Sequence, residues 1–233
     1  MPGLGGLWSD LTDLVLPVEC AGCRERRPGL RHGVCPECAA ALDALRPRAV
    51  RPTPAPPDLP PCVALGPYAG PLRETLLAYK DHGRHGLARP LGALLAEVVA
   101  AAVGEARPVT LVPVPDTAAA ARARYGDHLG RLTRHCADRL RRAGWPVRVR
   151  RPLRALPRPD SVTLDSAGRA AAAESAFRVR PRVAPAPDGA VVVLDDILTT
   201  GSTLAAVARA LTVSGLSPTV AAVLAATEKR HRS

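Results

Sequence analysis

Residues 191–204 limit the possible folds of this chain more than any other stretch of its sequence. Four apolar residues in a row, Val191 to Leu194, predict a strand buried on both faces, as strands of parallel sheets are. The adjacent acids Asp195 and Asp196 follow, and we expect them to end the strand. An apolar run then predicts a helix over about residues 203–213. The stretch therefore predicts a strand, a loop and a helix N-terminus in succession.

The loop between this strand and this helix has the composition of an anion-binding site. Backbone N–H groups at a helix N-terminus are free to donate, and the helix dipole favours negative charge there. The loop adds four hydroxyl side chains and a glycine that lets a phosphate approach the backbone closely: Thr199, Thr200, Gly201, Ser202 and Thr203. No Lys follows the glycine, so this is not a Walker loop.

The two carboxylates before the loop offer a second kind of contact. Asp195 and Asp196 could accept hydrogen bonds from ribose hydroxyls, as an acidic residue does in dinucleotide-binding folds. A sugar 5-phosphate with its ring diol exposed would suit both the acids and the loop. The plainer alternative is an ordinary strand that is capped by Asp and Thr before a helix.

Four cysteines near the N-terminus have the spacing of a zinc site. Cys20 and Cys23 form one C-x2-C knuckle, and Cys35 and Cys38 form a second one after eleven intervening residues. Two such knuckles can wrap one tetrahedral Zn²⁺, and a segment with so few large apolar residues needs such a ligand in order to fold. Four sulfur ligands leave no open position on the metal, which predicts structural zinc. Disulfides are the alternative, but the expected cytoplasmic setting disfavours them.

A Pro-rich segment separates this module from the rest of the chain. Seven of the sixteen residues at 46–61 are Pro, which predicts a stiff, extended linker. We therefore divide the chain into a zinc-ribbon module at 1–45, a linker at 46–61 and a main domain at 62–233. Cys62 and Cys136 belong to the main domain, where we interpret them as core thiols.

Strand and helix patterns alternate along the main domain. Strands are predicted at 62–66, 109–115, 147–149, 191–194 and 219–226, and helices from residue 71, over 87–103 and over 203–213. Asp116 and Thr117 are expected to cap one long Ala- and Arg-rich helix. This alternation predicts the α/β class, with a parallel sheet flanked by helices.

The positive charge of the chain is concentrated in one segment. The net charge is +11, and twelve Arg against two Asp lie between Arg122 and Arg158. Leu129, Leu132, Cys136 and Leu140 predict a buried helical stripe there, which should turn Arg131, Arg134, Arg141 and Arg142 towards solvent. This surface is either a solvated helix face or a contact surface for the phosphates of single- or double-stranded DNA.

Targeting signals are not visible in the sequence. No run approaches 18 apolar residues, so we expect no membrane span. The N-terminus has no basic region of the kind that opens a signal peptide. We therefore expect a cytoplasmic protein.

The motifs resemble those of a known family. Residues 191–203 resemble the phosphoribosyl-pyrophosphate (PRPP) signature of type I phosphoribosyltransferases. Together with residues 68–80, residues 111–115, and Arg169 with Phe177, they occur in the order seen in the ComF family. That family joins an N-terminal zinc ribbon to a type I phosphoribosyltransferase domain and is linked to DNA uptake in natural competence. The family usually has an Arg-Gly-Phe-Asn-Gln-like run where this chain has residues 124–128, and a later Gln where it has Asp160 and Ser161.

The resemblance implies roles for these residues. In type I transferases Mg²⁺ bridges the pyrophosphate and ribose hydroxyls of PRPP, and an acceptor nitrogen captures the oxocarbenium-like sugar. Asp195 and Asp196 would hold the ribose diol as the catalytic pair, and Thr199 to Thr203 would hold the 5-phosphate. Lys80, Asp116 and Arg124 would face the pyrophosphate, and residues 161–169 would form a mobile flap. For Lys80, a solvated position at a helix end is the alternative.

Two classes of function follow from this reading. The first is a PRPP-dependent phosphoribosyltransferase, a glycosyltransferase that acts on a nucleobase-like acceptor and is linked to competence. The second is a non-catalytic nucleic-acid-binding or regulatory module that retains a pocket for PRPP or a nucleoside 5-phosphate. An acceptor-binding hood would separate the two classes, and only the zinc-ribbon module and the linker could form one here.

Overall fold

A six-stranded sheet forms the centre of the molecule, with strand order β1-β2-β8-β7-β3-β4. The structure is a computed structural model, and it describes residues 19–123, 126–156, 176–180 and 188–227. The sheet strands are β1 (Arg48–Val50), β2 (Cys62–Pro67), β3 (Val109–Pro113), β4 (Val147–Val149), β7 (Ala190–Leu198) and β8 (Val220–Ala226). All neighbouring pairs are parallel except β1, which runs antiparallel to β2. The α/β class and the mostly parallel sheet are therefore confirmed.

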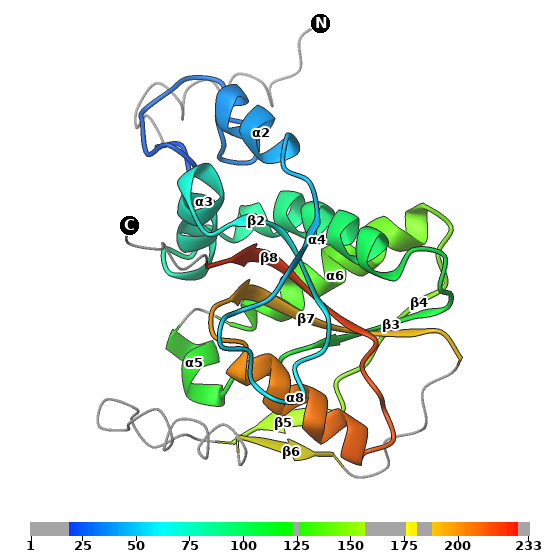
Figure 1. Ribbon diagram of the computed structural model, residues 1–233. Helices are drawn as coiled ribbons and strands as arrows, with labels where there is room; N and C mark the ends of the chain where they lie inside the picture. The colour runs from blue at the N-terminus through cyan, green and yellow to red at the C-terminus, as the bar shows by residue number, and fades with distance from the viewer. Residues whose placement is uncertain (1–18, 124–125, 157–175, 181–187, 228–233) are drawn as a thin grey trace, which may run out of the picture.

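Helices cover both faces of this sheet (Figure 1). On one face lie α3 (Gly70–Lys80), α4 (Ala88–Val103), which continues the 3-10 turn η1 (His85–Leu87), and α6 (His128–Arg142). On the other face lie α8 (Ser202–Val213) and a separate two-stranded sheet of β5 (Leu153–Ala155) and β6 (Phe177–Val179). The central strands are buried on both faces because each face packs against a helical layer.

Strand β7 is longer than the sequence predicts. It runs through both acids to Leu198, and Asp195 and Ile197 pair with Val223 and Ala225 of β8. The expectation that Asp195 and Asp196 end the strand is therefore wrong. Adjacent acids are poor strand formers in isolation, so their place in β7 needs compensating contacts from other elements.

The expected single Arg-rich helix is two helices. A short helix α5 (Ala118–Ala123) is followed by α6, and Gly126 lies between them with a φ of 121°. Asp127, not Asp116, caps α6, since its carboxylate accepts a hydrogen bond from the Gly130 N–H at 2.7 Å. The predicted apolar stripe of α6 is nevertheless buried, and it packs against α4 and the sheet.

The N-terminal module (residues 19–45) packs on the main domain. It contains helix α2 (Pro36–Asp43), and its buried residues join the same core as α3 and α4. Arg84, between α3 and η1, donates hydrogen bonds to the Glu19 carbonyl at 2.8 Å and to the Gly33 carbonyl at 3.1 Å. These bonds fix the module to the segment that follows α3.

The Pro-rich segment after this module takes part in the fold. Its residues Arg48–Val50 form edge strand β1, whose three residues pair with β2. Leu59, farther along, is 8% exposed and joins the core beneath α8. Val50 pairs with Cys62, so residues 51–61 turn back on themselves and the segment is not extended over its whole length. Its strand β1 covers one edge of β2.

One helical stretch among the described residues, His85–Val103, is long and apolar enough to cross a membrane by length and composition. Half of its most apolar window is buried within the molecule, where α4 packs on α6, β2 and β8. Core helices of globular folds meet the same criterion, so the length of this helix does not indicate a membrane span.

Candidate functional site at the carboxyl ends of the central strands

The two central strands β3 and β7 lie side by side and are followed by helices on opposite faces of the sheet. The chain leaves β3 towards α6, which packs on one face, and leaves β7 through α8, which packs on the other. In open parallel sheets, such a reversal leaves a crevice at the carboxyl ends of the two strands, where ligands bind. Asp116 follows β3, and Asp195 to Thr203 occupy the end of β7 and the loop after it.

The alternation of β7 separates its two acids. Successive side chains of a strand point to opposite faces, and Val192 and Leu194 lie in the core with α3, α4 and α6. Asp196 follows the same alternation and points into that layer. Asp195 instead points to the α8 face and lines a hollow with the loop after β7. The two carboxylates therefore do not face the same space.

The loop after β7 (residues 199–203, the β7–α8 loop) lines this open hollow together with Asp195. Thr199 and Thr200 are exposed, and the Thr200 and Ser202 hydroxyl oxygens lie 3.0 Å apart at the start of α8. Gly201 has a φ of 79°, a left-handed conformation that favours glycine. A Cβ at Gly201 would lie 3.1 Å from Leu59, so its missing side chain faces the Pro-rich segment and not the hollow.

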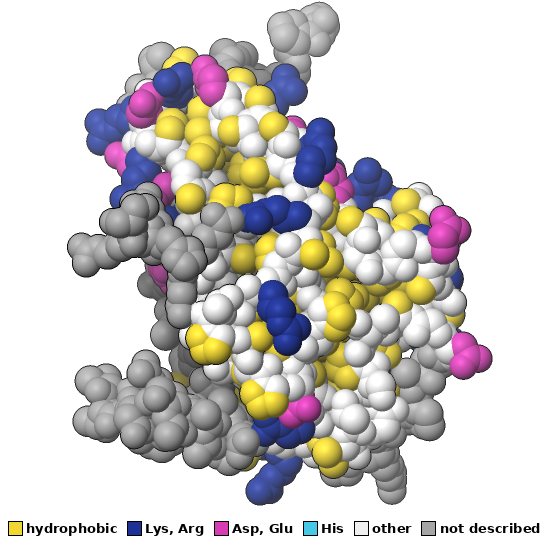
Figure 2. Space-filling view, viewed as in Figure 1, with side chains coloured by type: hydrophobic (Ala, Val, Ile, Leu, Met, Phe, Trp, Pro, Cys, Tyr) yellow, Lys and Arg dark blue, Asp and Glu magenta, His cyan; other side chains and the backbone are white. Residues whose placement is uncertain are grey.

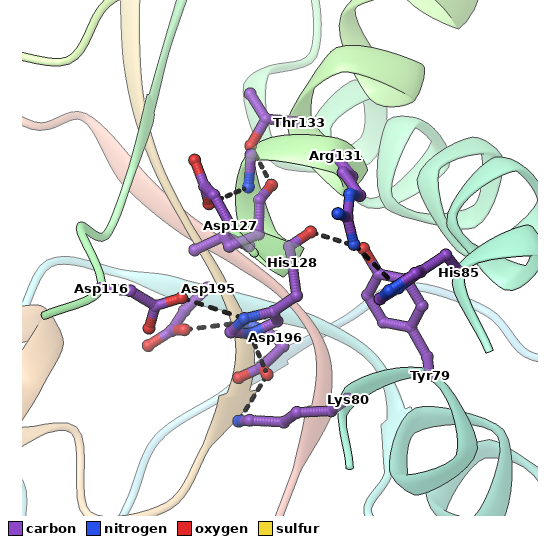
Figure 3. Close-up of polar contacts among 12 residues, drawn as sticks. Tyr79, Lys80, His85, Asp116, Asp127, His128, Arg131, Thr133, Asp195 and Asp196 are labelled. Carbon is purple, nitrogen blue, oxygen red and sulfur yellow. Dashed lines mark hydrogen bonds and ion pairs between the residues drawn. The ribbon is translucent and has the colours of Figure 1, made fainter. Parts of the chain in front are cut away.

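Asp196 is held by two cations from the opposite layer (Figure 3). The Lys80 ammonium, at the end of α3, lies 2.6 Å from Asp196 Oδ2, and His128 Nε2, at the start of α6, lies 3.1 Å from the same oxygen. The Asp196 side chain is only 7% exposed, so these contacts replace water as its counter-charges. Lys80 is therefore not the solvated helix-end residue of the alternative reading.

His128 joins this strand to the loop after β3. Its second ring nitrogen, Nδ1, lies 3.0 Å from Asp116 Oδ2, and its side chain is 4% exposed. Its backbone carbonyl accepts a hydrogen bond from the buried Tyr79 hydroxyl at 2.6 Å. We call Lys80, Asp116, His128 and Asp196 the charged cluster. These four residues come from α3, the loop after β3, α6 and β7.

The charged groups shift the pKa values of their neighbours. Burial disfavours ionisation of Asp196, but the hydrogen bond from His128 and the charge of Lys80 outweigh burial and lower the pKa of Asp196. Burial also disfavours charged His128, but Asp116 and Asp196 outweigh it and raise the pKa of His128 to about 9. Burial and the charge of Asp196 raise the pKa of Asp195.

The structure brings together most, but not all, of the predicted site. Asp116, Asp195 and Asp196 meet at one edge of the sheet with Lys80 and the β7–α8 loop. Arg124 and the predicted flap at 161–169, with Asp160, Ser161 and Arg169, lie outside the described residues. His128 was not predicted as a site residue. The only signal for it was a His beside an Asp in the run at 124–128, which sequence alone does not distinguish from a surface pair.

The four N-terminal cysteines form a second candidate site. The sulfur atoms of Cys20, Cys23, Cys35 and Cys38 all lie within 4.8 Å of one another, and all six cysteines of the chain are free thiols. A tetrahedral zinc with Zn–S bonds of about 2.3 Å fits sulfurs at such distances. This cluster can therefore hold a metal ion such as zinc, whereas the disulfide alternative does not describe the structure.

The backbone around these sulfurs is arranged for thiolates. N–H groups of Gly22 and Cys35 donate to Cys20 Sγ at 3.3 and 3.2 Å. Burial raises the pKa of Cys20, but these N–H groups outweigh burial and lower it to about 6. Burial and the neighbouring sulfurs raise the pKa of Cys38. Four thiolates this close together, three of them on buried residues, repel each other's charge unless a cation lies between them.

The Arg side chains of α6 do not form one solvent-facing row. Arg134 and Arg142 are exposed, as predicted, and Arg141 is exposed but also donates to the Val147 carbonyl at 3.1 Å. Arg131 differs, because it is partly buried with its guanidinium 2.8 Å from His85 Nδ1. On the face drawn in Figure 2, Lys and Arg side chains are scattered among apolar and uncharged ones.

Comparison of the sequence with protein-family models and with curated proteins finds no match in either.

Proposed function

We propose that the crevice at β3 and β7 binds a phosphorylated ribose, PRPP or a nucleoside 5-phosphate, with Mg²⁺, as the resemblance to ComF-type phosphoribosyltransferases implies. The observation that carries this proposal is the shared hollow of Asp195 and the β7–α8 loop. One carboxylate there adjoins a cluster of hydroxyls at a helix N-terminus. The carboxylate can accept a hydrogen bond from a sugar hydroxyl, and the hydroxyls at the helix N-terminus can donate to a phosphate.

The proposal gives the two acids different roles. Asp195 accepts hydrogen bonds from the ribose diol because it faces the hollow. Asp196 is already bound by Lys80 and His128, so its role is to hold these two side chains in place. The 5-phosphate lies on the β7–α8 loop, where it receives backbone and hydroxyl donors. Mg²⁺, bound by oxygens of the ligand itself, would supply positive charge to the leaving pyrophosphate. The side of the crevice near Lys80 then takes the pyrophosphate.

Calorimetric titration with PRPP and Mg²⁺, repeated with ribose 5-phosphate, tests the site. Replacing Thr200→Val with Ser202→Ala removes two exposed hydroxyls and should weaken binding at least about tenfold. The matched control is Thr212→Val with Ser214→Ala, at the other end of α8, where both hydroxyls bond to helix carbonyls. Equal binding by both double variants, or no binding by the parent protein, would contradict the proposal.

A second measurement separates the enzyme from the sensor. If the protein is a phosphoribosyltransferase, pyrophosphate should be released when PRPP is supplied with a suitable free nucleobase. Departure of pyrophosphate breaks the C1–O bond, and the acceptor nitrogen forms the new bond to C1. Binding of PRPP without pyrophosphate release for every nucleobase tested favours the regulatory module with a retained pocket.

DNA binding is a second candidate function, favoured by the exposed side chains of Arg134 and Arg142 on α6. Contacts to duplex phosphates should give about −0.9 in the log–log salt slope for each phosphate. Replacing both residues with Gln should reduce that slope without a change in PRPP binding. Arg209→Gln, on α8 at the opposite face, is the control. Absence of DNA binding at low salt would identify the Arg residues as a solvated surface.

A cytoplasmic setting is part of the proposal. It is supported by six free cysteines, four of them placed to hold a metal, since reducing compartments keep such thiols available. The link to DNA uptake rests on the resemblance alone. Measurement of transformation frequency in a strain that lacks the protein tests it.

A further inference from the structure

His128 lies between two carboxylates that belong to different parts of the sheet. Its Nδ1 faces Asp116 Oδ2 at 3.0 Å, and its Nε2 faces Asp196 Oδ2 at 3.1 Å (Figure 3). Asp116 follows β3 and Asp196 lies within β7, so the ring spans the two strands that border the crevice. The hollow of Asp195 and the β7–α8 loop lies at the end of one of them, β7.

Both ring nitrogens must donate to make this arrangement favourable. A neutral imidazole has one N–H and one lone pair, so one of the two carboxylates would face a lone pair. The imidazolium can donate to Asp196 and forms an ion pair with Asp116, and its side-chain exposure of 4% leaves little water to replace either contact. The raised pKa of His128, caused by the same two carboxylates, agrees with this geometry.

We propose that His128 is a positioning residue whose imidazolium ties the loop after β3 to β7 and keeps the crevice receptive to an anionic ligand. This inference rests on the proposed function, because it concerns how the same site keeps its affinity for a phosphorylated sugar. The mechanism is electrostatic and geometric, and His128 itself does not contact the ligand.

The electrostatic part follows from the charges that face His128 from every packed element. Asp116, Asp195 and Asp196 are acids, and Lys80 is the other cation within the cluster. Outside it lie the Tyr79 hydroxyl of α3, the Asp127 cap and Arg131 of α6, and His85 of η1, which contacts Arg131. Loss of the His128 proton makes the local charge more negative by one unit. An incoming phosphate is then repelled more strongly.

The geometric part follows from a backbone contact. The Asp196 N–H donates to Asp195 Oδ1 at 2.9 Å, so the position of Asp196 sets that of the carboxylate in the hollow. Release of Asp196 by a neutral His128 would therefore disturb Asp195. The ring thus acts on the ligand through both residues of the pair.

The test compares PRPP affinity at pH 7.5 and pH 10 in the parent protein and in His128→Gln. The secondary phosphate ionisation of PRPP is complete over this range. Asp195 and Lys80 are present in both proteins, so a change in affinity that only the parent shows is due to His128. The parent should lose about tenfold in affinity as His128 loses its proton. His128→Gln, which is neutral throughout, should bind weakly already at pH 7.5 and lose much less. His82→Gln, at an exposed histidine, is the control and should follow the parent.

A second variant and a direct measurement protect the test against misfolding. Asp116→Asn keeps the side-chain volume but removes one counter-charge, so the loss of affinity should begin at lower pH. Imidazole resonances should show His128 titrating well above its ordinary range in the parent and lower in Asp116→Asn. If PRPP is bound with the same pH dependence by parent and His128→Gln, or if His128 titrates near pH 6.5, this inference is wrong. If the parent binds no PRPP at any pH, the proposed function is wrong instead.

Discussion

The cysteine cluster and the charged cluster both gather acidic side chains in a buried place, but they balance that charge differently. The four cysteine sulfurs face one another within 4.8 Å, so their thiolates need an ion from solution between them. Asp116 and Asp196 have their cations built into the chain, in Lys80 and His128. The first cluster can therefore bind a metal, and the second lies beside the ligand site that we propose.

The two clusters also differ in the source of their stability. The N-terminal module has a small apolar core and must gain folding free energy from a ligand. The members of the charged cluster come from α3, α6, β7 and the loop after β3, and its ion pairs bridge elements that the apolar core already brings together. Removing one partner from each cluster should thus have different consequences.

The largest effect is expected from Cys20→Ser. This change removes one of four ligands and should abolish the binding of about one zinc per chain, with loss of ordered structure in residues 19–45. Metal analysis and hydrogen exchange of the module measure the two effects. Cys62→Ser, at a buried thiol outside the cluster, should keep its zinc. If the parent protein is purified without zinc, the prediction that the cysteine cluster binds this metal is wrong.

A smaller but substantial effect is expected from Asp196→Asn. It leaves Lys80 and His128 without their shared counter-charge in a buried place, which should cost about 3 kcal/mol of unfolding free energy. Urea denaturation measures this cost. Asp138→Asn, which breaks an exposed pair with Arg141, should cost less than about 1 kcal/mol. Similar costs for both variants would mean that the charged cluster is as well solvated as a surface pair.

The stability of the parent should fall as pH rises above neutrality. The pKa of His128 is about 9 in the folded state against an ordinary 6.5, so its stabilisation is complete below pH 6.5 and is lost as pH passes 9. The loss amounts to about 3 kcal/mol at most. The raised pKa of Asp195 acts in the same direction, since its folded state holds a proton that the unfolded state releases.

Denaturation of His128→Gln across the same pH range isolates the histidine contribution. Its free energy of unfolding should change less between pH 6.5 and 9 than that of the parent, and the remaining slope should come from Asp195. A slope equal to that of the parent would show that His128 is not charged in the folded protein.

The smallest effect is expected from Gly201→Ala, in the loop beside the charged cluster. Its φ of 79° should cost about 1 kcal/mol with a side chain present. Gly215→Ala is a matched control, because Gly215 has a φ of 81° but open space around its Cβ position. Any excess cost at Gly201 measures its contact with Leu59. If Gly201→Ala costs no more than Gly215→Ala, the Pro-rich segment shifts easily to make room for the added methyl group.

The sequence predicted features that depend on local pattern. The apolar run at 191–194, the stripe of α6 and the spacing of the four cysteines each specify their partners within a short distance along the chain, and the structure has them in place. The class of fold followed from the alternation of such patterns. The cysteine cluster could be predicted equally well, because all four sulfurs come from two adjacent knuckles.

The features that escaped prediction depend on distant contacts. Two acids in a row indicated a strand end, but β7 continues through them because His128, 68 residues earlier, and Lys80 neutralise Asp196. The break at Gly126 was hidden within an Ala- and Arg-rich run that favours a helix. Strands β5 and β6, of three residues each, are too short to show a period.

The contact between Leu59 and Gly201 bears on where this chain can be shortened. A fragment that begins at residue 62 would keep every parallel strand, but it would lose the β1 edge and the side chains that back the β7–α8 loop. Ala64 and its neighbours in β2 would then present an unpaired edge to other molecules, which favours aggregation. The shortest fragment that retains both the closed edge and the supported loop therefore begins before Arg48.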